Sequence, residues 1–481
     1  FDESNESSVV TTVESVVSQL FPNWVLIINN HQKLNHNSLE KILLFGDSRI
    51  KFLDSNSLEL GDWVVEIKSG TTLHEAALFA TAIAVIKNSE IVLVYSDQDH
   101  IDNNGTFCDP YLKPDWNSDL FAAINYISPF VVCKKELWEP ERKKTSNQYD
   151  FLLQVTKQVQ RHKILHLPYL LASDQIYDKS HLHPPVKRVN YVLPNPLPLV
   201  SILIPTRDQG TILERCLESL LDETDYSNLE VILIDHETKE SKALDIISKF
   251  TIKKNFQVLS YKGPFNFSAM INRAAKISNG QILLLLNNDT EVTDRQWLKE
   301  LVSQVSRPDV GVVGNLLLFG DNTIQHAGVH PGMGGLMGHG HKHLPSDDSG
   351  YFNRLNAVHE VAAVTGACMA IKKNTWNELD GLDEKNLPVT YNDIDLCLKA
   401  REKNLKVIFT PFSKVFHHES ISRGVDDPPE RNERLREEIN FMKKKWGTFL
   451  EKDPAYNPNL ELNEGTFKLS QTPRTLPISE L

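Results

Sequence analysis

Three short segments carry the side chains best suited to chemistry. Asp289 ends the triplet Asn287-Asn288-Asp289 in LLLLNNDTEV, Asp393 lies in YNDIDLCLKA, and His417 lies in VFHHES. A carboxylate beside amide oxygens suits Mg²⁺ or Mn²⁺, and a neutral imidazole can complete the coordination of such an ion. A carboxylate at the mouth of a cleft can accept the proton of an attacking hydroxyl. These residue types could therefore bind a divalent cation and activate a hydroxyl.

Each segment also has a structural interpretation, which is favoured when the segment is taken alone. The NND triplet could be an Asx turn that ends a strand. Asp393 and Asp395 could cap the helix that follows them. His417 and His418 could be buried residues with hydrogen-bond partners. A functional interpretation is favoured only if the surrounding strands and helices bring the three segments together.

The chain from residue 200 alternates short apolar runs with amphipathic segments. Strands are expected at 200–205, 231–235, 256–261 and 281–286, and helices at 211–221, 239–250 and 268–278. Continuous apolar strands separated by helices predict an α/β fold whose sheet is covered on both faces. In such sheets ligands bind beyond the carboxyl ends of the strands. The polar residues at those ends are Thr206, Arg207, Asp208, Asp235, His236 and the NND triplet.

Length and composition indicate a folded protein with two domains. The chain has 481 residues, 41% hydrophobic and 24% charged, which is ordinary for globular proteins. Five prolines in 181–199 predict an extended linker between a first domain at 1–180 and a second at 200–450, with a tail at 451–481. The net charge of −12 is a poor match for a nucleic-acid ligand.

Several features favour a cytoplasmic location. The longest apolar run is strand-sized, far short of the roughly 20 residues that span a bilayer. The amino-terminal residues FDESNESS do not have the pattern of a secretory signal. The five scattered cysteines include no CxxC pair and are interpreted as small buried residues in a reducing compartment. Peripheral contact with the inner face of a membrane is left open.

Taken together and in order, the motifs resemble family 2 glycosyltransferases with the A-type fold. The nearest likeness is to rhamnosyltransferase-like enzymes of bacterial O-antigen and surface-polysaccharide assembly. The matching segments are VSILIPTRD, FNFSAMIN, LLLLNNDTEVTDRQWL, TIQHAGV, VTGACMAIKK, YNDIDLCLKA, VFHHESISRG and YNPNL. They cover about residues 195–470, and the combination is specific although each motif alone is weak.

The resemblance implies a role for individual positions. Asp393 would be the general base, and Asp289 with His417 would hold Mg²⁺ or Mn²⁺. The first carboxylate of the family's metal triplet is Asn287 here, and the Glu that often precedes the base is Asn392. The residues implied in donor binding are Pro205, Thr206, Arg207, Asp208, Asp235, Asn272 and Asn288.

The resemblance also implies the reaction. A nucleotide sugar (UDP-, dTDP- or GDP-linked) would donate its sugar, with inversion, to a glycan or lipid-linked glycan acceptor. The hydroxyl deprotonated by Asp393 would attack the anomeric carbon in line, while the metal neutralises the departing diphosphate.

The first half of the chain reads as a degraded copy of the second. The segments 22–29, 62–73 and 147–155 parallel 228–235, 281–292 and 392–400, and 164–173 parallels 407–416. Gly70 stands at the position of Asp289, Gln148 at that of Asp393, and the histidines are matched by a stretch around Ser173. Glycine and glutamine cannot replace those carboxylates. We expect a structural or acceptor-positioning domain, in preference to a second active site built from Asp97, Asp99 and Asp102.

Three other interpretations are less well supported by the residues. A catalytically inactive sugar- or nucleotide-binding scaffold would fit if both copies had decayed, but Asp235, Asp289, Asp393 and His417 favour an enzyme. A dinucleotide oxidoreductase is disfavoured because PTRDQGT, without a GxGxxG pattern, follows the strand VSILIP. The glycine-rich segment 326–343, with His339, His341 and His343, is expected to be a surface loop over the cleft and not a metal site.

Overall fold

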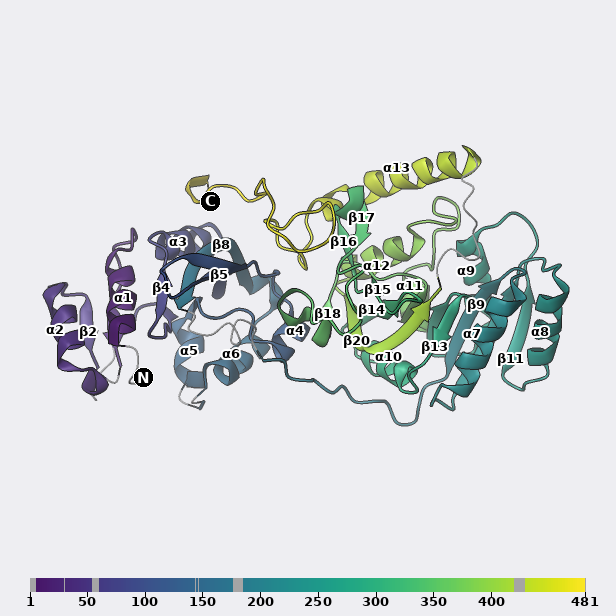
Figure 1. Cartoon of the computed structure of the whole chain (residues 1–481), viewed down its shortest axis with the longest axis horizontal. Helices are drawn as coiled ribbons and strands as arrows, with labels where there is room; N and C mark the ends of the chain where they lie inside the picture. Colours follow the sequence, from purple (N-terminus) through teal and green to yellow (C-terminus); the bar gives the residue numbers. More distant parts are fainter. Residues whose placement is uncertain are drawn as a thin grey trace. The chain divides into compact units, whose positions relative to one another are not determined.

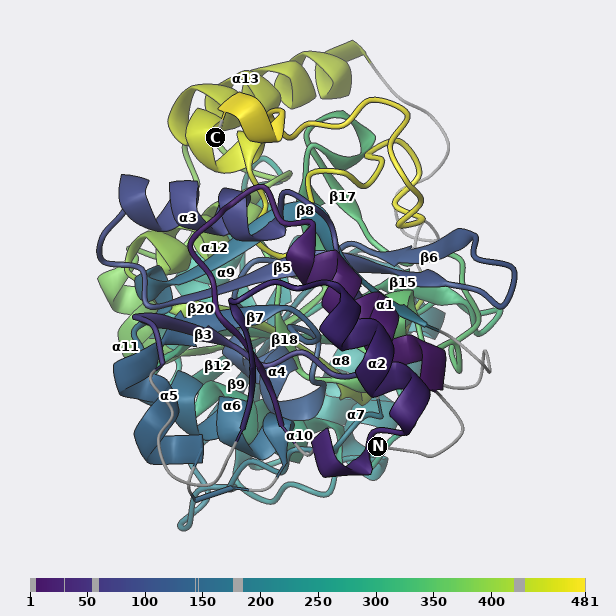
Figure 2. The same cartoon turned by 90° about the vertical axis from the view of Figure 1, so that its left-hand side faces the viewer.

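The computed structural model describes residues 6–29, 31–53, 60–142, 144–145, 147–175, 185–418 and 429–480. The chain divides into two compact units (Figures 1 and 2). Unit 1 consists of Phe1–Pro185, Tyr456–Leu460 and Ser470–Leu481, and unit 2 of Val186–Ala455 and Glu461–Leu469. The tail therefore contributes residues to both units, and each unit is described by itself.

Unit 2 is built on a mixed sheet of ten strands. Its central path runs β11-β10-β9-β12-β19-β14-β20-β13, with β15 paired to β14 and β18 paired to β20. The strands are β9 (Val200–Thr206), β10 (Leu229–Asp235), β11 (Phe256–Ser260), β12 (Ile282–Leu286), β13 (Thr290–Val292), β14 (Val310–Leu318), β15 (Ile324–His326), β18 (His359–Glu360), β19 (Cys368–Lys372) and β20 (Lys406–His417).

Helices cover both faces of this sheet. One face packs against α7 (Gly210–Asp222), α8 (Ser241–Thr251) and α10 (Trp297–Val305). The other packs against α9 (Phe267–Ile277), α11 (Lys373–Glu378), α12 (Asn392–Glu402) and α13 (Pro429–Glu451). All five residues of β12 are buried, as continuous apolar strands between two helix layers require. The α/β class and the strand–helix alternation predicted from the sequence are confirmed.

The strand order of unit 2 reverses beside β9. Strands β11, β10, β9 and β12 are mutually parallel, and β9 lies between β10 and β12. The chain thus leaves β9 toward one side for β10 and β11, and returns to the other side for β12. Such a reversal separates the loops on either side and leaves room for a ligand at the carboxyl ends of the strands. The loops after β9 and β12 border this point.

Unit 1 contains a six-stranded mixed sheet and a separate parallel pair. The pair is β1 (Leu26–Ile28) and β2 (Ile50–Phe52). The larger sheet has the order β3-β7-β5-β8-β4, with β6 on β5. Its strands are β3 (Trp63–Val65), β4 (Thr71–Leu73), β5 (Leu93–Ile101), β6 (Phe107–Tyr111), β7 (Val131–Lys134) and β8 (Ile164–Gln175). The helices are α1 (Glu6–Val17), α2 (His36–Leu44), α3 (Ala77–Lys87), α4 (Ser118–Ala123), α5 (Lys135–Arg142) and α6 (Gln148–Lys157).

The sheet of unit 1 repeats half of the sheet of unit 2. The order β3-β7-β5-β8-β4, with β6 on β5, matches β12-β19-β14-β20-β13, with β15 on β14. Thr71 pairs with Asp174 where Thr290 pairs with His417. Gly70 therefore precedes β4 as Asp289 precedes β13, which agrees with the sequence comparison. The register also places Asp174 at the position of His417, within the stretch around Ser173 that the sequence comparison indicates.

A short segment of the tail is anchored inside unit 1. The amide of Asn457 donates to Asp97 Oδ2 at 2.9 Å and to the Lys113 carbonyl at 2.8 Å. Asp97 Oδ1 also lies 2.8 Å from His166 Nε2 and accepts the backbone N–H of Lys113 at 2.8 Å. Asp97 is completely buried and fully engaged. It therefore holds the fold together and does not serve a second active site.

Candidate active site

The loop after β12 places Asp289 against His417. The antiparallel pairing of β13 with β20 sets Thr290 opposite His417, and the backbone N–H of His418 donates to the Asp289 carbonyl at 2.9 Å. As a result Asp289 Oδ1 lies 3.1 Å from His417 Nε2. Both residues are buried. Two of the three predicted chemical groups thus meet at the carboxyl end of the sheet.

Gln325, which sequence reasoning did not single out, determines which ring nitrogen of His417 carries the proton. Its side-chain amide donates to the His417 carbonyl at 3.2 Å, so its carbonyl oxygen faces His417 Nδ1 at 2.6 Å. Nδ1 must then be the donor, and Nε2 of the neutral ring carries the lone pair. Gln325 lies in β15, and only the β14–β15 hairpin brings it to His417.

The lone pair of His417 faces a carboxylate oxygen that has no donor. Asp289 Oδ1 is buried and receives no hydrogen bond from any described residue. The Asn287 amide lies 3.2 Å from Nε2, which is consistent with an acceptor there. Two electron-rich atoms 3.1 Å apart are unfavourable unless a cation or a proton lies between them. The pair therefore fits a divalent ion, although within the described ranges no three His, Cys, Asp or Glu side chains converge.

Asp393 occupies the first turn of α12. Its Oδ2 accepts the backbone N–H of Gly366 at 2.8 Å and its Oδ1 accepts that of Ile394 at 2.8 Å. Burial raises the pKa of Asp393 above its ordinary value, and these backbone donors oppose the shift only in part. A Cβ on Gly366 would lie 3.3 Å from the Asp393 Cβ, so the close approach depends on glycine. The arrangement gives a carboxylate with an increased tendency to hold a proton.

The segment Thr365–Ala367 links Asp393 to the loop after β12. Gly366 donates to Asp393, and the carbonyl of the next residue, Ala367, accepts the backbone N–H of Asn287 at 2.9 Å. Two neighbouring residues just before β19 therefore hold both parts of the site: Gly366 binds Asp393, the candidate general base, and Ala367 binds the loop that carries Asp289.

The predicted donor-binding residues fall into two groups. Around the switch point, the Asn288 amide donates to Thr206 Oγ1 at 3.0 Å, and Asp235 pairs with Thr206 across β9 and β10. Asp208 Oδ1 accepts the backbone N–H groups of Lys239 and Glu240, which lower its pKa. Arg207 is exposed, and Pro205 pairs with Ile234.

Asn272 has a different position. Its side chain exchanges hydrogen bonds with the backbone of Leu382, at 2.9 and 3.0 Å, and so fixes the loop that precedes α12. The donor-binding roles of all these residues stay predictions.

The histidine-rich segment differs from the expected surface loop. His326, His330 and His341 are buried. His330 Nδ1 lies 2.7 Å from Asp453 Oδ2, and Phe467 stacks on His341 at 4.1 Å between ring centres. The expectation of a surface loop holds for His343, which is exposed, but fails for His341, because Phe467, distant in sequence, packs on it within unit 2.

Asp395 links two helices rather than capping one. It is completely buried, and its Oδ1 accepts from Lys445 Nζ at 2.6 Å and from Trp446 Nε1 at 2.7 Å, both on α13. Asp395 therefore has different partners from Asp393: side chains of α13 in place of backbone N–H groups.

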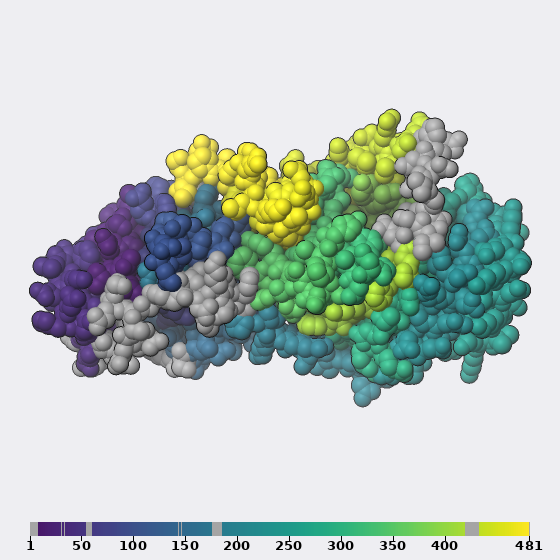
Figure 3. Space-filling model, viewed as in Figure 1, coloured from purple at the N-terminus to yellow at the C-terminus, as the bar shows by residue number. Residues whose placement is uncertain are grey.

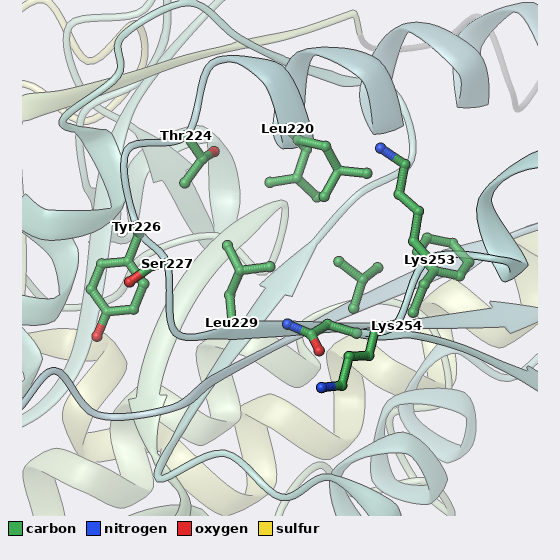
Figure 4. Close-up of a pocket in the computed structure, with 11 residues that line it drawn as sticks. Leu220, Thr224, Tyr226, Ser227, Leu229, Lys253 and Lys254 are labelled. Atoms are coloured by element: carbon green, nitrogen blue, oxygen red, sulfur yellow. The ribbon is translucent and has the colours of Figure 1, made fainter.

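A separate pocket lies at the opposite edge of the sheet (Figure 4). Its volume is about 290 Å³, and Leu229 and Phe256, which line it, are the first residues of β10 and β11. It thus lies at the amino ends of these strands and does not belong to the candidate site.

Comparison with known proteins identifies the family. Residues 201–373 match the family described as Glycosyl transferase family 2. This part of the chain is a family 2 glycosyltransferase domain. The matched range contains the donor candidates, the metal triplet and Gly366, while Asp393 and His417 follow it in the same unit.

Two curated relatives are similar over nearly the whole chain. An uncharacterised protein of Sinorhizobium fredii, y4gI, is 34% identical over 517 residues, covering 96% of this chain and 57% of its own length. The O-antigen biosynthesis protein RfbC of Myxococcus xanthus is 29% identical over 513 residues, covering 96% and 40%. The chain thus spans about half the length of these relatives.

Among solved structures, the chain resembles GalNAc-T7, crystallised with UDP, GalNAc and Mn²⁺. The TM-score is 0.43 at 17% identity, covering 53% of this chain and 49% of that one. This likeness assigns no residue role. Within the described parts of the chain, no helix is long and apolar enough to cross a membrane.

Proposed function

We propose that unit 2 transfers a sugar, with inversion, from a nucleotide-sugar donor to a hydroxyl of a glycan or lipid-linked glycan acceptor. The proposal rests on one observation above all, the contact of Asp289 with His417 at the carboxyl end of a family 2 glycosyltransferase sheet. A relative that bears the name of an O-antigen biosynthesis protein supports an acceptor in surface-polysaccharide assembly.

Asp289 and His417 are the residues that would hold Mg²⁺ or Mn²⁺. The charge of the ion would neutralise the nucleoside diphosphate as it departs. Gln325 orients the ring so that Nε2 is available for the ion, in the way that outer partners orient metal-binding histidines. With Asn287 in place of a carboxylate, the protein supplies less negative charge to the ion than a triplet with two aspartates would.

Asp393 would take the proton from the acceptor hydroxyl as it attacks. Its raised pKa increases its strength as a base once it is ionised. Thr206, Asn288 and Asp235 border the switch point, where the base and ribose of the donor would bind. Arg207, which follows β9 and is exposed, is a further candidate for contact with the donor.

Two substitutions separate the proposed roles. Asp393→Asn should retain donor binding and lose transfer by about 10²-fold or more, because a general base contributes roughly 10²–10⁴-fold. Asp289→Ala should weaken both metal-dependent donor binding and transfer. The measurements are calorimetric binding of UDP, dTDP and GDP with and without Mn²⁺, and transfer from a panel of the corresponding sugars.

The same measurements test the alternative function. A protein that binds nucleotide but transfers no sugar from any donor would be a scaffold, in keeping with the lost carboxylate at Asn287. Normal transfer by Asp393→Asn would refute the assignment of the base but would leave the enzyme itself standing.

A further inference from the structure

Arg354 is buried in unit 2 without an acidic partner. It lies in the 3₁₀ segment η5 (Tyr351–Asn356) and is only 2% exposed. Its Nη1 donates to the Ala455 carbonyl at 2.9 Å, whereas Nε and Nη2 are buried and have no hydrogen-bond partner among the described residues. No Asp or Glu of those residues forms an ion pair with it. Because a guanidinium in a protein is always protonated, a buried positive charge is left without compensation.

The two unpartnered nitrogens, Nε and Nη2, form one edge of the guanidinium. We name this edge the Arg354 fork. Its two parallel N–H groups have the geometry that binds two oxygens of one carboxylate or phosphate. A water molecule could accept these hydrogen bonds, but it would leave the buried charge uncompensated. An anion with several oxygens satisfies the donors and the charge together.

Two aromatic rings stabilise the charge of Arg354 without accepting the hydrogen bonds of the fork. The guanidinium carbon lies over the Tyr351 ring, 5.3 Å from its centre, and over the Phe467 ring at 5.6 Å. Such cation–π contacts offset part of the cost of removing the cation from water. The N–H groups of the fork still have no acceptor.

His341 supplies a further unpartnered donor at the same aromatic ring. Phe467 stacks on His341 with 4.1 Å between ring centres. His341 Nε2 accepts the backbone N–H of Tyr351 at 3.1 Å, so Nδ1 carries the proton of the neutral ring. Burial above all, and then the neighbouring His330 and Arg354, lower the pKa of His341 well below its ordinary value, which keeps the ring neutral. Its Nδ1 is buried and has no partner among the described residues.

The backbone around this cluster is strained. His341, Phe352, Asn353 and Phe467 have φ angles of 60°, 47°, 65° and 57°, in the left-handed region that residues other than glycine rarely adopt. Conformations of this kind persist where the surroundings impose them, and they gather at ligand clamps. The strain and the uncompensated charge therefore occur in one place.

The tail closes over this cluster within unit 2. The carbonyl of Gly465 accepts the backbone N–H of His341 at 3.3 Å. Figure 1 shows the tail, in yellow, beside β16 (Val329–Pro331) and β17 (Met337–His339). A ligand held between Arg354 and His341 would thus join η5 to the loop that the tail covers.

We propose that the Arg354 fork binds a phosphate group, with His341 Nδ1 as a further donor. A phosphate has oxygens for all three N–H groups, and its negative charge compensates the guanidinium. The phosphate can be a free ion enclosed by the tail or the phosphate group of a larger ligand. The site uses none of the residues assigned to the metal, the donor or the base, so the inference does not rest on the proposed function.

Hydrogen exchange of the whole chain tests the site. Inorganic phosphate is titrated in the presence of EDTA, which removes any divalent ion at Asp289 and His417, and sodium chloride of equal ionic strength is the reference. At about 100 times its Kd, phosphate should slow exchange in η5 and in residues 339–343 by about 100-fold, because opening then requires release of the ligand. A parallel titration uses phenyl phosphate. Slowing by inorganic phosphate alone supports an enclosed free ion, and equal slowing by phenyl phosphate supports the phosphate group of a larger ligand.

Arg354→Met removes the fork and its charge but retains an unbranched side chain to pack on the two rings. Since it takes an uncompensated charge out of the interior, we expect this variant to fold. It should abolish the effect of phosphate. Arg295→Met is the matched control at an arginine of unit 2 whose side chain is 62% exposed, and it should leave the effect unchanged.

Three results would overturn the proposal: no slowing by phosphate beyond that of chloride, equal slowing by chloride, or an effect of phosphate that persists in Arg354→Met. The first two come from the unmodified chain, so they decide the question even if the variant does not fold. No readout uses sugar transfer or a metal, and a failure here would leave the proposed function of unit 2 untouched.

Discussion

Asp393 and Asp395 are separated by one residue on α12, yet their surroundings differ. Asp395 accepts hydrogen bonds from the Lys445 ammonium and the Trp446 indole of α13, and Lys399 of its own helix lies 3.3 Å from it. Asp393 accepts the backbone N–H groups of Gly366 and Ile394 and a hydrogen bond from the Thr365 side chain, and no Lys or Arg of the described residues forms an ion pair with it. A carboxylate that is held by dipoles and remains unpaired with a cation keeps its basicity. We therefore predict that Asp393 transfers the proton and that Asp395 contributes to packing.

The pKa of Asp393 predicts how transfer depends on pH. Because burial raises this pKa, the carboxylate is protonated at pH values where an ordinary aspartate, with a pKa of about 3.9, is ionised. Transfer should therefore fall, as the pH decreases, at a higher pH than a free aspartate would give. The measurement is kcat between pH 4 and 8 at saturating donor and acceptor. A rate that stays constant down to the ordinary pKa would contradict the assignment.

The same shift has a consequence for stability. The folded protein holds the Asp393 proton more tightly than the unfolded chain does, so protonation stabilises the fold at low pH. This contribution is lost as the pH rises through the folded pKa. Asp393→Asn should accordingly flatten the dependence of the free energy of unfolding on pH in that range.

Among the elements, α13 is held to the rest of unit 2 through α12. Asp395 is completely buried, and Lys445 and Trp446 reach it from α13 while Lys399 lies 3.3 Å from it on α12. Asp395→Asn should lower the free energy of unfolding of unit 2 by about 1.5–3 kcal/mol, the range for hydrogen bonds to charged groups. Urea denaturation measures this. Asp393→Asn is the matched control in the same helix, and an equal loss in both variants would show that the two carboxylates do not differ as described.

The elements could be predicted from sequence more fully than the site. Buried strands such as Ile282–Leu286 are continuous apolar runs, and amphipathic helices separate them, so strand and helix were both visible. The contact of Asp289 with His417 depends on the pairing of β13 with β20, which no local pattern encodes. Gln325 reaches His417 only through the hairpin of β14 and β15. The burial of His341 depends on Phe467, far along the chain.

The repeat also shows what a local pattern can and cannot reveal. The loss of a carboxylate at Gly70 is visible in the sequence, because one residue replaces another at an aligned position. Asp174 stands at the position of His417 both in the alignment of 164–173 with 407–416 and in the register of β4 with β8.

At the scale of the whole molecule, the two units should respond to different perturbations. The candidate active site lies entirely within unit 2, and the Asn457 anchor lies entirely within unit 1. Figure 3 shows part of the tail, in yellow, on the face of the molecule turned to the viewer. Loss of a contact in one unit should therefore leave the stability of the other largely unchanged, because each has its own hydrophobic core.

Asn457→Ala and a nucleotide with metal test this independence together. The substitution leaves Asp97 Oδ2 buried without its amide donor, which should cost unit 1 about 1–3 kcal/mol. Mn²⁺ with a nucleoside diphosphate at 100 times its Kd should stabilise unit 2 by about 2.7 kcal/mol.

Hydrogen exchange in urea, measured separately for each peptide of the chain, distinguishes the two units. We expect the substitution to speed exchange in β5 and β8 alone and the ligand to slow it in β9, β12 and β20 alone. Coupled changes in both units, from either perturbation, would show that they fold as one.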